Sequence, residues 1–300
     1  MKDFVIFADS AANVPFEFVK KYDIKIIPFL YNLEGVDYPC FTNDENFAET
    51  AKAFYKKMDE GAEFKTTLVN EARIIEAVAP VMEKGCDAVI FTITADMSGT
   101  FNQANKAKAV LEEKYPDCRL HVLDSANASM GEGLQVIKFA EMKAAGESLE
   151  NCLKYWEDTV YKINSFVTVA DLKYLKKSGR VSTIVALAGA LLNIKPIMWA
   201  NGTAPAKLTV CAKERGRKKS LTAIVDAFKQ RVINPAEQTV AITHANCEED
   251  ALWLAEQVKA LGAKDVIIEY YDLCTGAHVG PGTIALFFLG KDRRESAAKD

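Results

Sequence analysis

The sequence has little of the material from which metal and redox sites are built. Its three histidines form no H-E-x-x-H or H-x-x-E-H pair, so the usual zinc spacings are missing. Its seven cysteines include no C-x-x-C, which removes a zinc knuckle and a thioredoxin-type motif from consideration. We therefore expect neither a metal nor a cofactor, and a reduced protein in the cytoplasm.

Other absences narrow the class of function. A basic surplus is missing, because 37 Lys and Arg stand against 41 Asp and Glu, and this net charge of -4 argues against nucleic-acid binding. The longest apolar stretch, Ile184–Leu192, is far shorter than the roughly 20 residues of a membrane span. We expect no stable membrane insertion, while transient contact with a membrane surface stays open. Neither a Walker G-x-x-x-x-G-K-[ST] motif nor a G-x-S-x-G nucleophile elbow occurs.

The order of apolar segments predicts an α/β protein of two domains. Residues 1–162 alternate strand-like and helix-like segments, which is typical of βαβ units with a mostly parallel sheet and flanking helices. One helix is predicted over Phe47–Asp59, with Phe47, Ala51, Phe54, Tyr55 and Met58 on its apolar face. Residues 163–300 place strands next to one another between single helices, which predicts an α+β domain with a mixed sheet. We expect the boundary near residues 161–164.

A loop that follows the strand-like Ala88–Ile93 is the first candidate for a binding site. It reads TADMSGTFNQA, and Thr100 followed by Gln103 predicts a capping box for the next helix. Ser98 and Gly99 would then lie at a helix N-terminus, where backbone N–H groups and the helix dipole favour an anion. Plain N-capping explains the same residues and stays open as an alternative.

Three further loops carry hydroxyl, glycine or imidazole groups. The segment FKTTLVN (64–70) places Thr66 and Thr67 before a predicted helix, where they serve either as caps or as ligand donors. The segment DSANASMGEG (124–133) contains only an incomplete G-x-G-x-x-G, so we reject a dinucleotide site. The segment TGAHVGPG (275–282) predicts a constrained turn between two strands that holds His278, as a ligand-binding or a structural residue.

Two basic clusters border predicted helices. KKSGR (176–180) closes one helix, where cations complement the dipole. KERGRKK (213–219) opens another, where the dipole disfavours cations, and this placement indicates either an anionic partner or a solvated face. With anion-binding loops present and no convincing nucleophile or redox centre, the residues favour a binding protein.

Eight segments in one order resemble the motifs of the DegV family of fatty-acid-binding proteins. In the first half these are ADSAANVP (8–15), KTTLVN (65–70), MSGTF (97–101) and DSANASMGEG (124–133). In the second half they are LKYLKKSGRVS (172–182), GALLNIKPIM (189–198), ERGRKKSL (214–221) and AHVGPGTIAL (277–286). The resemblance covers nearly the whole chain. Leu68 and Val69 depart from it, because the family has Gln-Pro there, as do Ser178 and Val279.

The resemblance implies a two-domain fold, with a long-chain fatty acid in a tunnel between the domains and no catalysis by the chain itself. It assigns the fatty-acid carboxylate to Thr66, Thr67, Ser98 and Gly99, joined by His278. It implies a fatty acid kinase as partner, in bacterial phospholipid metabolism, with Arg180 and Arg215 contacting that kinase or the acyl phosphate. The helix predicted over Thr183–Leu192, apolar on nearly all sides, is either a candidate wall of the tunnel or an ordinary core helix.

Two other functions remain open at this point. In the first, the protein is a small-molecule phosphotransferase or hydrolase that uses His278 as acid or base, with Arg180 and Arg215 on a phosphate. In the second, it is a lipid-responsive interaction module whose partner binds the basic face at residues 213–219.

Overall fold

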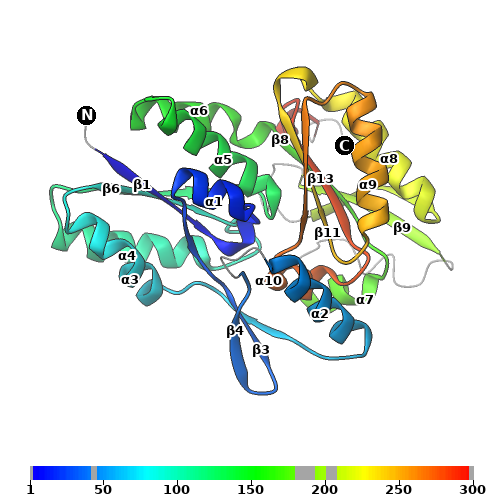
Figure 1. Ribbon diagram of the computed structural model, residues 1–300, viewed down its shortest axis with the longest axis horizontal. Coiled ribbons are helices and arrows are strands. Elements are labelled where there is room, and N and C mark those ends of the chain that lie inside the picture. The colour runs from blue at the N-terminus through cyan, green and yellow to red at the C-terminus, as the bar shows by residue number, and fades with distance from the viewer. Residues whose placement is uncertain (1–2, 42–45, 180–192, 201–207, 297–300) are drawn as a thin grey trace. The chain divides into compact units, whose positions relative to one another are not determined.

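The computed structural model describes residues 3–41, 46–179, 193–200 and 208–296 (Figure 1). The chain divides into two units, of which the first comprises Met1–Phe47 and Phe64–Val160. The second comprises Ala48–Glu63 and Tyr161–Asp300, so it takes in a short segment from the N-terminal half. The candidate tunnel wall Thr183–Leu192 and Arg180 lie outside the described residues.

A parallel sheet forms the centre of the first unit. Its strand order is β2-β1-β6-β7, and all three pairings are parallel, as the alternating pattern predicts. The two central strands are buried almost throughout, which explains their nearly unbroken apolar sequences. The strands are β1 (Phe4–Asp9), β2 (Lys25–Ile27), β6 (Asp87–Thr92) and β7 (Leu120–Asp124).

Five α-helices flank this sheet in two groups. α3 packs with α4, whereas α5 packs with α1 and α6, and Figure 1 shows the groups on opposite faces of the sheet. α6 is absent from the sequence prediction, although Ser148 caps its start by accepting a hydrogen bond from the Asn151 N–H at 3.2 Å. The helices are α1 (Phe16–Tyr22), α3 (Glu71–Met82), α4 (Thr100–Lys114), α5 (Met130–Ala144) and α6 (Leu149–Thr159).

The first unit also has a small antiparallel sheet that the sequence did not predict. Its order is β4-β3-β5, formed by β3 (Leu30–Leu33), β4 (Val36–Pro39) and β5 (Lys65–Thr67). The turn between β3 and β4 places Glu34 and Gly35 at φ 53° and 87°, which fits a tight hairpin turn. Tyr31 and Tyr38 stack across the hairpin, with ring centroids 5.3 Å apart.

A mixed six-stranded sheet forms the centre of the second unit, which confirms the predicted α/β class. Its order is β10-β9-β8-β13-β11-β12; β11 and β12 are parallel, and the other pairs are antiparallel. The strands are β8 (Ile163–Thr168), β9 (Ile194–Ala200), β10 (Leu208–Arg215), β11 (Thr239–His244), β12 (Asp265–Tyr270) and β13 (Ile284–Leu289).

Helices α8 (Arg217–Arg231) and α9 (Glu248–Ala260) bury an aromatic and aliphatic core against this sheet. Phe228 of α8 is fully buried and meets the Phe288 ring edge-on, with centroids 4.9 Å apart. Single turns of 3₁₀-helix occur at η1 (Ser10–Ala12), η2 (Val160–Lys162) and η4 (Pro235–Glu237). Among the described residues, no helix is both long enough and apolar enough to cross a bilayer.

Three short elements of the second unit pack together: α2 (Phe47–Asp59), α7 (Leu172–Ser178) and α10 (Leu273–Val279). Tyr174 of α7 donates from its hydroxyl to the Met58 carbonyl of α2 at 3.5 Å. All five apolar residues predicted for one face of α2 are buried, which confirms that prediction.

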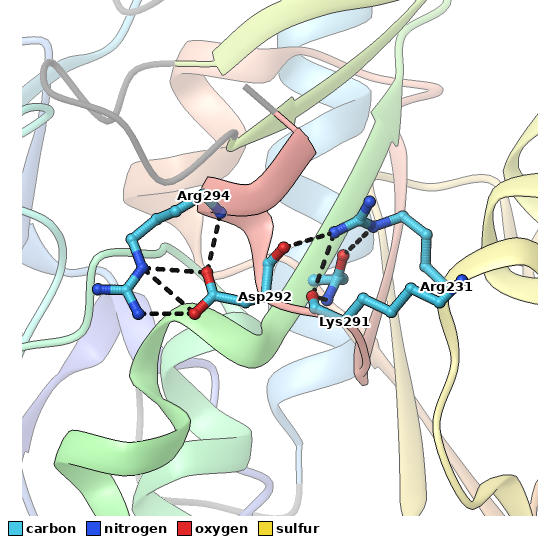
Figure 2. A network of polar contacts seen from close by, with 5 residues as sticks. Arg231, Lys291, Asp292 and Arg294 are labelled. Carbon is cyan, nitrogen blue, oxygen red and sulfur yellow. Dashed lines mark hydrogen bonds and ion pairs between the residues drawn. The ribbon is translucent and has the colours of Figure 1, made fainter. Parts of the chain in front are cut away.

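An arginine network fastens the C-terminal segment to the second unit (Figure 2). Arg231 donates from Nε to the Asn164 side-chain oxygen at 2.6 Å and from Nη2 to the carbonyls of Lys291 and Asp292 at 3.1 Å. Arg294, at the start of α11 (Arg293–Ser296), pairs with the Asp292 carboxylate at 2.6 Å. The network holds the last described turn next to β8 and α8.

Replacing Gly133 by alanine is expected to lower the free energy of unfolding by about 2 kcal/mol. Gly133 lies in the first turn of α5, and a Cβ there would stand 2.3 Å from the Ala12 carbonyl oxygen. Chemical denaturation measures the loss, with Lys138→Ala on the same helix as control. If Gly133→Ala left the denaturation midpoint unchanged, the η1 turn would be able to move away from the added Cβ without a loss of stability.

Candidate functional site

The carboxyl ends of β1 and β6 meet at one edge of the parallel sheet, where α/β proteins commonly bind ligands. Asp9 is fully buried there, and its two carboxylate oxygens accept from the Ala11 and Ile93 N–H groups, each at 2.9 Å. The Ser10 hydroxyl oxygen accepts from the Phe29 N–H, also at 2.9 Å. Asp9 therefore fixes the loop that leaves β6.

The loop after β7 supports that same β6 loop from the other side. Asp124 accepts from the Ala95 N–H at 3.2 Å, and burial raises the pKa of its carboxyl. The Asn127 carbonyl accepts from the Thr94 N–H at 2.9 Å. The hydroxyl of Ser129 donates to the Asn13 side-chain oxygen at 2.9 Å. The segment 124–133 thus acts as a rigid support, and its hydroxyl groups bond within the protein.

Ser98 and Gly99 lie at the N-terminus of α4, as predicted. Gly99 is the N-cap and has no side chain with which to cap the helix. The Ser98 hydroxyl oxygen accepts from the Thr100 N–H at 3.3 Å, and the N–H groups that follow in the first turn lie at the positive end of the helix dipole, which favours an anion. The Ser98 hydroxyl lies 2.9 Å from the Thr100 hydroxyl, and both residues are at the very start of the helix. Ser98 and Gly99 are half-buried, which leaves them accessible to a ligand.

The predicted capping box of Thr100 and Gln103 is wrong. The helix begins at Thr100 itself, so Thr100 is a helical residue and Gly99 takes the cap position. The Gln103 side-chain oxygen instead accepts from the Glu71 N–H at 3.2 Å, at the start of α3. Gln103 therefore serves the neighbouring helix, a contact that local spacing does not reveal.

Thr66 and Thr67 belong to β5, a short strand where the sequence predicted a loop. Thr67 is exposed and Thr66 is half-buried. Leu68, the next residue, is so close to α4 that a Cβ on Gly99 would lie 3.2 Å from its Cδ2 atom. The first unit thus brings the segments 65–68 and 98–100 together, with the apolar Leu68 beside the uncapped helix start.

His278 belongs to the second unit and is in a helix, which corrects the predicted turn. The helix α10 begins because the Asp272 carboxylate accepts from the N–H groups of Cys274 and Thr275, at 2.9 and 3.1 Å. It ends at Gly280, whose φ of +82° favours glycine. His278 is half-buried in the last turn. The capping Asp272 is the sequence signal that would have predicted this helix.

Arg215 is the last residue of β10 and is exposed. The helix α8 starts two residues later at Arg217, so the basic cluster 213–219 covers a strand end and a first helical turn. Arg217 already has a partner, since its Nε donates to the Asp250 carboxylate at 2.8 Å. Arg180, the other arginine predicted for a partner, is outside the described residues.

Of the surface hollows that the described residues form, two are each lined by a single unit, and no predicted site residue lines either of them. One, of about 690 Å³, lies between His121 of β7 and the helix α6. The other, of about 320 Å³, lies between α8 and the strands β9 and β10, beside Trp199 and Arg231. The candidate site therefore rests on the residues at the sheet edge and not on these hollows.

Comparison with known proteins decides the family. A family described as "Uncharacterised protein, DegV family" matches residues 3–291. The chain belongs to the DegV family. It is 38% identical to a DegV domain-containing protein of Clostridium perfringens, over 97% of this chain and 98% of that protein. The resemblance of the eight sequence segments is thereby confirmed.

Solved structures of DegV proteins share the fold. A DegV lipid binding protein of Thermotoga maritima is 26% identical, with a TM-score of 0.80 over 97% of this chain and 99% of that one. A second Thermotoga maritima protein, whose structure is described as revealing a fatty acid binding function, is 26% identical. Its TM-score is 0.78, and the match covers 96% of this chain and 99% of that chain.

Proposed function

We propose that this DegV protein binds a long-chain fatty acid and holds its carboxylate at the start of α4. One observation carries the proposal: Leu68 lies against Gly99 and so brings the threonines of β5 to an uncapped helix N-terminus. The two Thermotoga maritima relatives, described as lipid binding and fatty acid binding, support a fatty acid as the ligand.

Hydroxyl and backbone N–H donors suit a carboxylate. Thr66, Thr67 and Ser98 supply hydroxyl groups, and Gly99 begins a helix whose dipole favours negative charge. Hydrogen bonds to an ionised group are roughly twice as strong as neutral ones. His278 of the second unit is proposed as a further donor. Because Leu68 stands in place of the family glutamine, the carboxylate would depend on these hydroxyls and on backbone N–H groups.

The acyl chain supplies most of the gross binding energy. At about 0.8 kcal/mol per buried methylene, a chain of roughly fifteen methylenes offers about 12 kcal/mol. Ordering of the ligand and of the protein reduces the net value. A tunnel between domains 1–162 and 163–300 is the proposed place for this chain.

Native mass spectrometry of the purified protein tests the proposal, followed by extraction and analysis of bound lipid. We expect one fatty acid per chain, either carried through purification or bound after incubation with mixed fatty acids. The control is the same protein after lipid extraction and refolding. A protein that binds no fatty acid under either condition would overturn the proposal.

We propose further that a fatty acid kinase phosphorylates the bound carboxylate, with Arg215 and Arg180 contacting the kinase or the acyl phosphate. The exposure of Arg215 supports its part in this contact. With a bacterial fatty acid kinase and ATP, hydroxylamine should trap acyl phosphate as a hydroxamate, and Arg215→Ala should reduce the yield. The exposed Lys229→Ala provides a control cation in the same unit. Equal yields from both variants would remove Arg215 from this role.

A further inference from the structure

Asp272 is a buried carboxyl at the start of the helix that carries His278. It is fully buried, and its Oδ1 atom accepts from the Cys274 and Thr275 N–H groups at 2.9 and 3.1 Å. Its Oδ2 atom is buried with no hydrogen-bond partner among the described residues. A carboxylate in this position is capped on one side and desolvated without compensation on the other, which favours the protonated form.

The helix α10 is packed tightly enough to respond to that carboxyl. A Cβ on Gly276 would stand 2.2 Å from the Tyr55 hydroxyl oxygen, so α10 contacts α2 at close range. The Tyr55 hydroxyl donates to the Tyr271 carbonyl at 3.3 Å, and the Gly276 N–H donates to the Asp272 carbonyl at 2.8 Å. Asp272, Tyr55 and the turn that holds His278 therefore form one packed group within the second unit.

The titratable groups around Asp272 in this unit are the Cys274 thiol, whose Sγ atom lies within 4.8 Å of an Asp272 carboxylate oxygen, and the phenols of Tyr55 and Tyr271. The Cys247 thiol, which precedes α9, acts on both phenols. Burial raises the pKa of both phenols, and the charge of Asp272 raises them further. Burial also raises the pKa of Cys247 to about 11. The side chains of Tyr55, Tyr271 and Cys247 therefore stay neutral between pH 5 and 8. The charged Glu49, Lys52 and Glu248 act on Tyr270.

Asp272 itself titrates within that range. Burial raises the pKa of its carboxyl to about 6, although the Thr275 hydroxyl and the two capping N–H groups lower it. The folded-state pKa lies above the unfolded value of about 3.9, so the folded protein holds this proton more tightly. The stability from this carboxyl is therefore complete below pH 4 and is lost as the pH rises to about 6.

We propose that Asp272 is a proton-sensing positioning residue that couples pH to the placement of His278 and so to fatty-acid affinity. When the pH rises, the proton leaves Oδ2 for solvent, and the unpaired charge loosens the packing of α10 on Tyr55. The proposal rests on fatty-acid binding as the function of the site. The titration of Asp272 would make fatty-acid binding depend on pH in addition to any dependence that comes from the carboxylate of the ligand.

Palmitic acid binding, measured by calorimetry between pH 5 and 8, tests this coupling in the wild type, Asp272→Asn and His278→Gln. Asparagine keeps the Oδ1 acceptor and cannot ionise. Because ionisation of the probe is common to all three proteins, ratios of dissociation constants isolate the contribution of the protein. The dissociation constant of the wild type, divided by that of Asp272→Asn, is expected to rise about threefold to tenfold from pH 5 to pH 8. Parallel profiles would overturn the proposal.

Carbon-13 NMR of labelled aspartate in the ligand-free wild type gives a second readout that needs no variant. The Asp272 carboxyl should titrate near pH 6, and the amide signals of Gly276 and His278 should follow it. A midpoint below pH 4.5, or helix signals that ignore the titration, would overturn the coupling. Absence of palmitic acid binding at every pH would instead overturn the proposed function, while the NMR titration would still decide whether Asp272 moves α10.

Discussion

Replacement of both Thr67 and Ser98 by alanine is expected to weaken fatty-acid binding about a hundredfold. Each hydroxyl can donate one hydrogen bond to the carboxylate, and a hydrogen bond to a charged group contributes about 1.5–3 kcal/mol. Two such losses amount to about 3 kcal/mol or more, which corresponds to a factor of roughly one hundred or more in the dissociation constant. Calorimetric titration with palmitic acid measures this effect directly.

The single variants and a stability measurement make this result specific to the site. Thr67 is exposed on β5, so Thr67→Ala should leave the unfolding midpoint in place. Ser98 also contacts the Thr100 hydroxyl at 2.9 Å, so Ser98→Ala should cost a small amount of stability as well. Thr222→Ala, at an exposed position of α8, is the control hydroxyl deletion. Affinity retained in the double variant would place the carboxylate elsewhere.

Leu68 sharpens this expectation for the present chain. The segment resembles a family motif with glutamine at this position, and here a leucine packs beside Gly99. Introducing Leu68→Gln would add a polar group next to the uncapped start of α4. Without a glutamine amide, the hydroxyls of Thr67 and Ser98 make a larger share of the contacts to the carboxylate. Replacing both by alanine should therefore weaken binding less in the Leu68→Gln variant than in the wild type.

Those parts of the fold that depend on local pattern could be predicted from the sequence. The nearly continuous apolar strands β1 and β6, and the single apolar face of α2, are buried as their patterns indicate. The segments at Ser98 and Gly99 were also placed correctly, because a strand followed by small and hydroxyl residues marks a helix start.

The remaining parts depend on contacts between distant residues. Gln103 looked like a capping residue, yet it binds the Glu71 N–H, 32 residues away in the sequence. The glycines around His278 suggested a loop, but Gly276 is part of the helix α10. Glycine is needed there because a Cβ would stand 2.2 Å from the Tyr55 hydroxyl oxygen. Spacing within one segment carries no information about such partners. In the same way, the sequence does not show that one oxygen of the Asp272 carboxyl is buried without a hydrogen-bond partner among the described residues. That feature depends on the residues packed around it.

Phe228→Ala is expected to lower the free energy of unfolding of the second unit by about 3–5 kcal/mol. Phe228 is fully buried, and its ring meets Phe288 edge-on at 4.9 Å. Phe288 in turn stacks on Phe166 with centroids 6.1 Å apart, so the cavity would open within an aromatic cluster that joins α8 to β13 and β8. Surrounding side chains fixed in β-strands can collapse only partly into such a cavity.

Urea denaturation followed by circular dichroism and tryptophan fluorescence measures this loss, because Trp199 stacks on Phe166 in the same cluster. Leu252→Ala on α9, where the side chain is 52% exposed, removes a similar apolar mass from the surface and should change stability by about 0.5 kcal/mol or less. If both variants lost equal stability, the packing of α8 on the sheet would not be the main source of stability in this unit. A selective loss in Phe228→Ala would show that the aromatic packing of α8 against β8 and β13 is a main source of stability in the second unit.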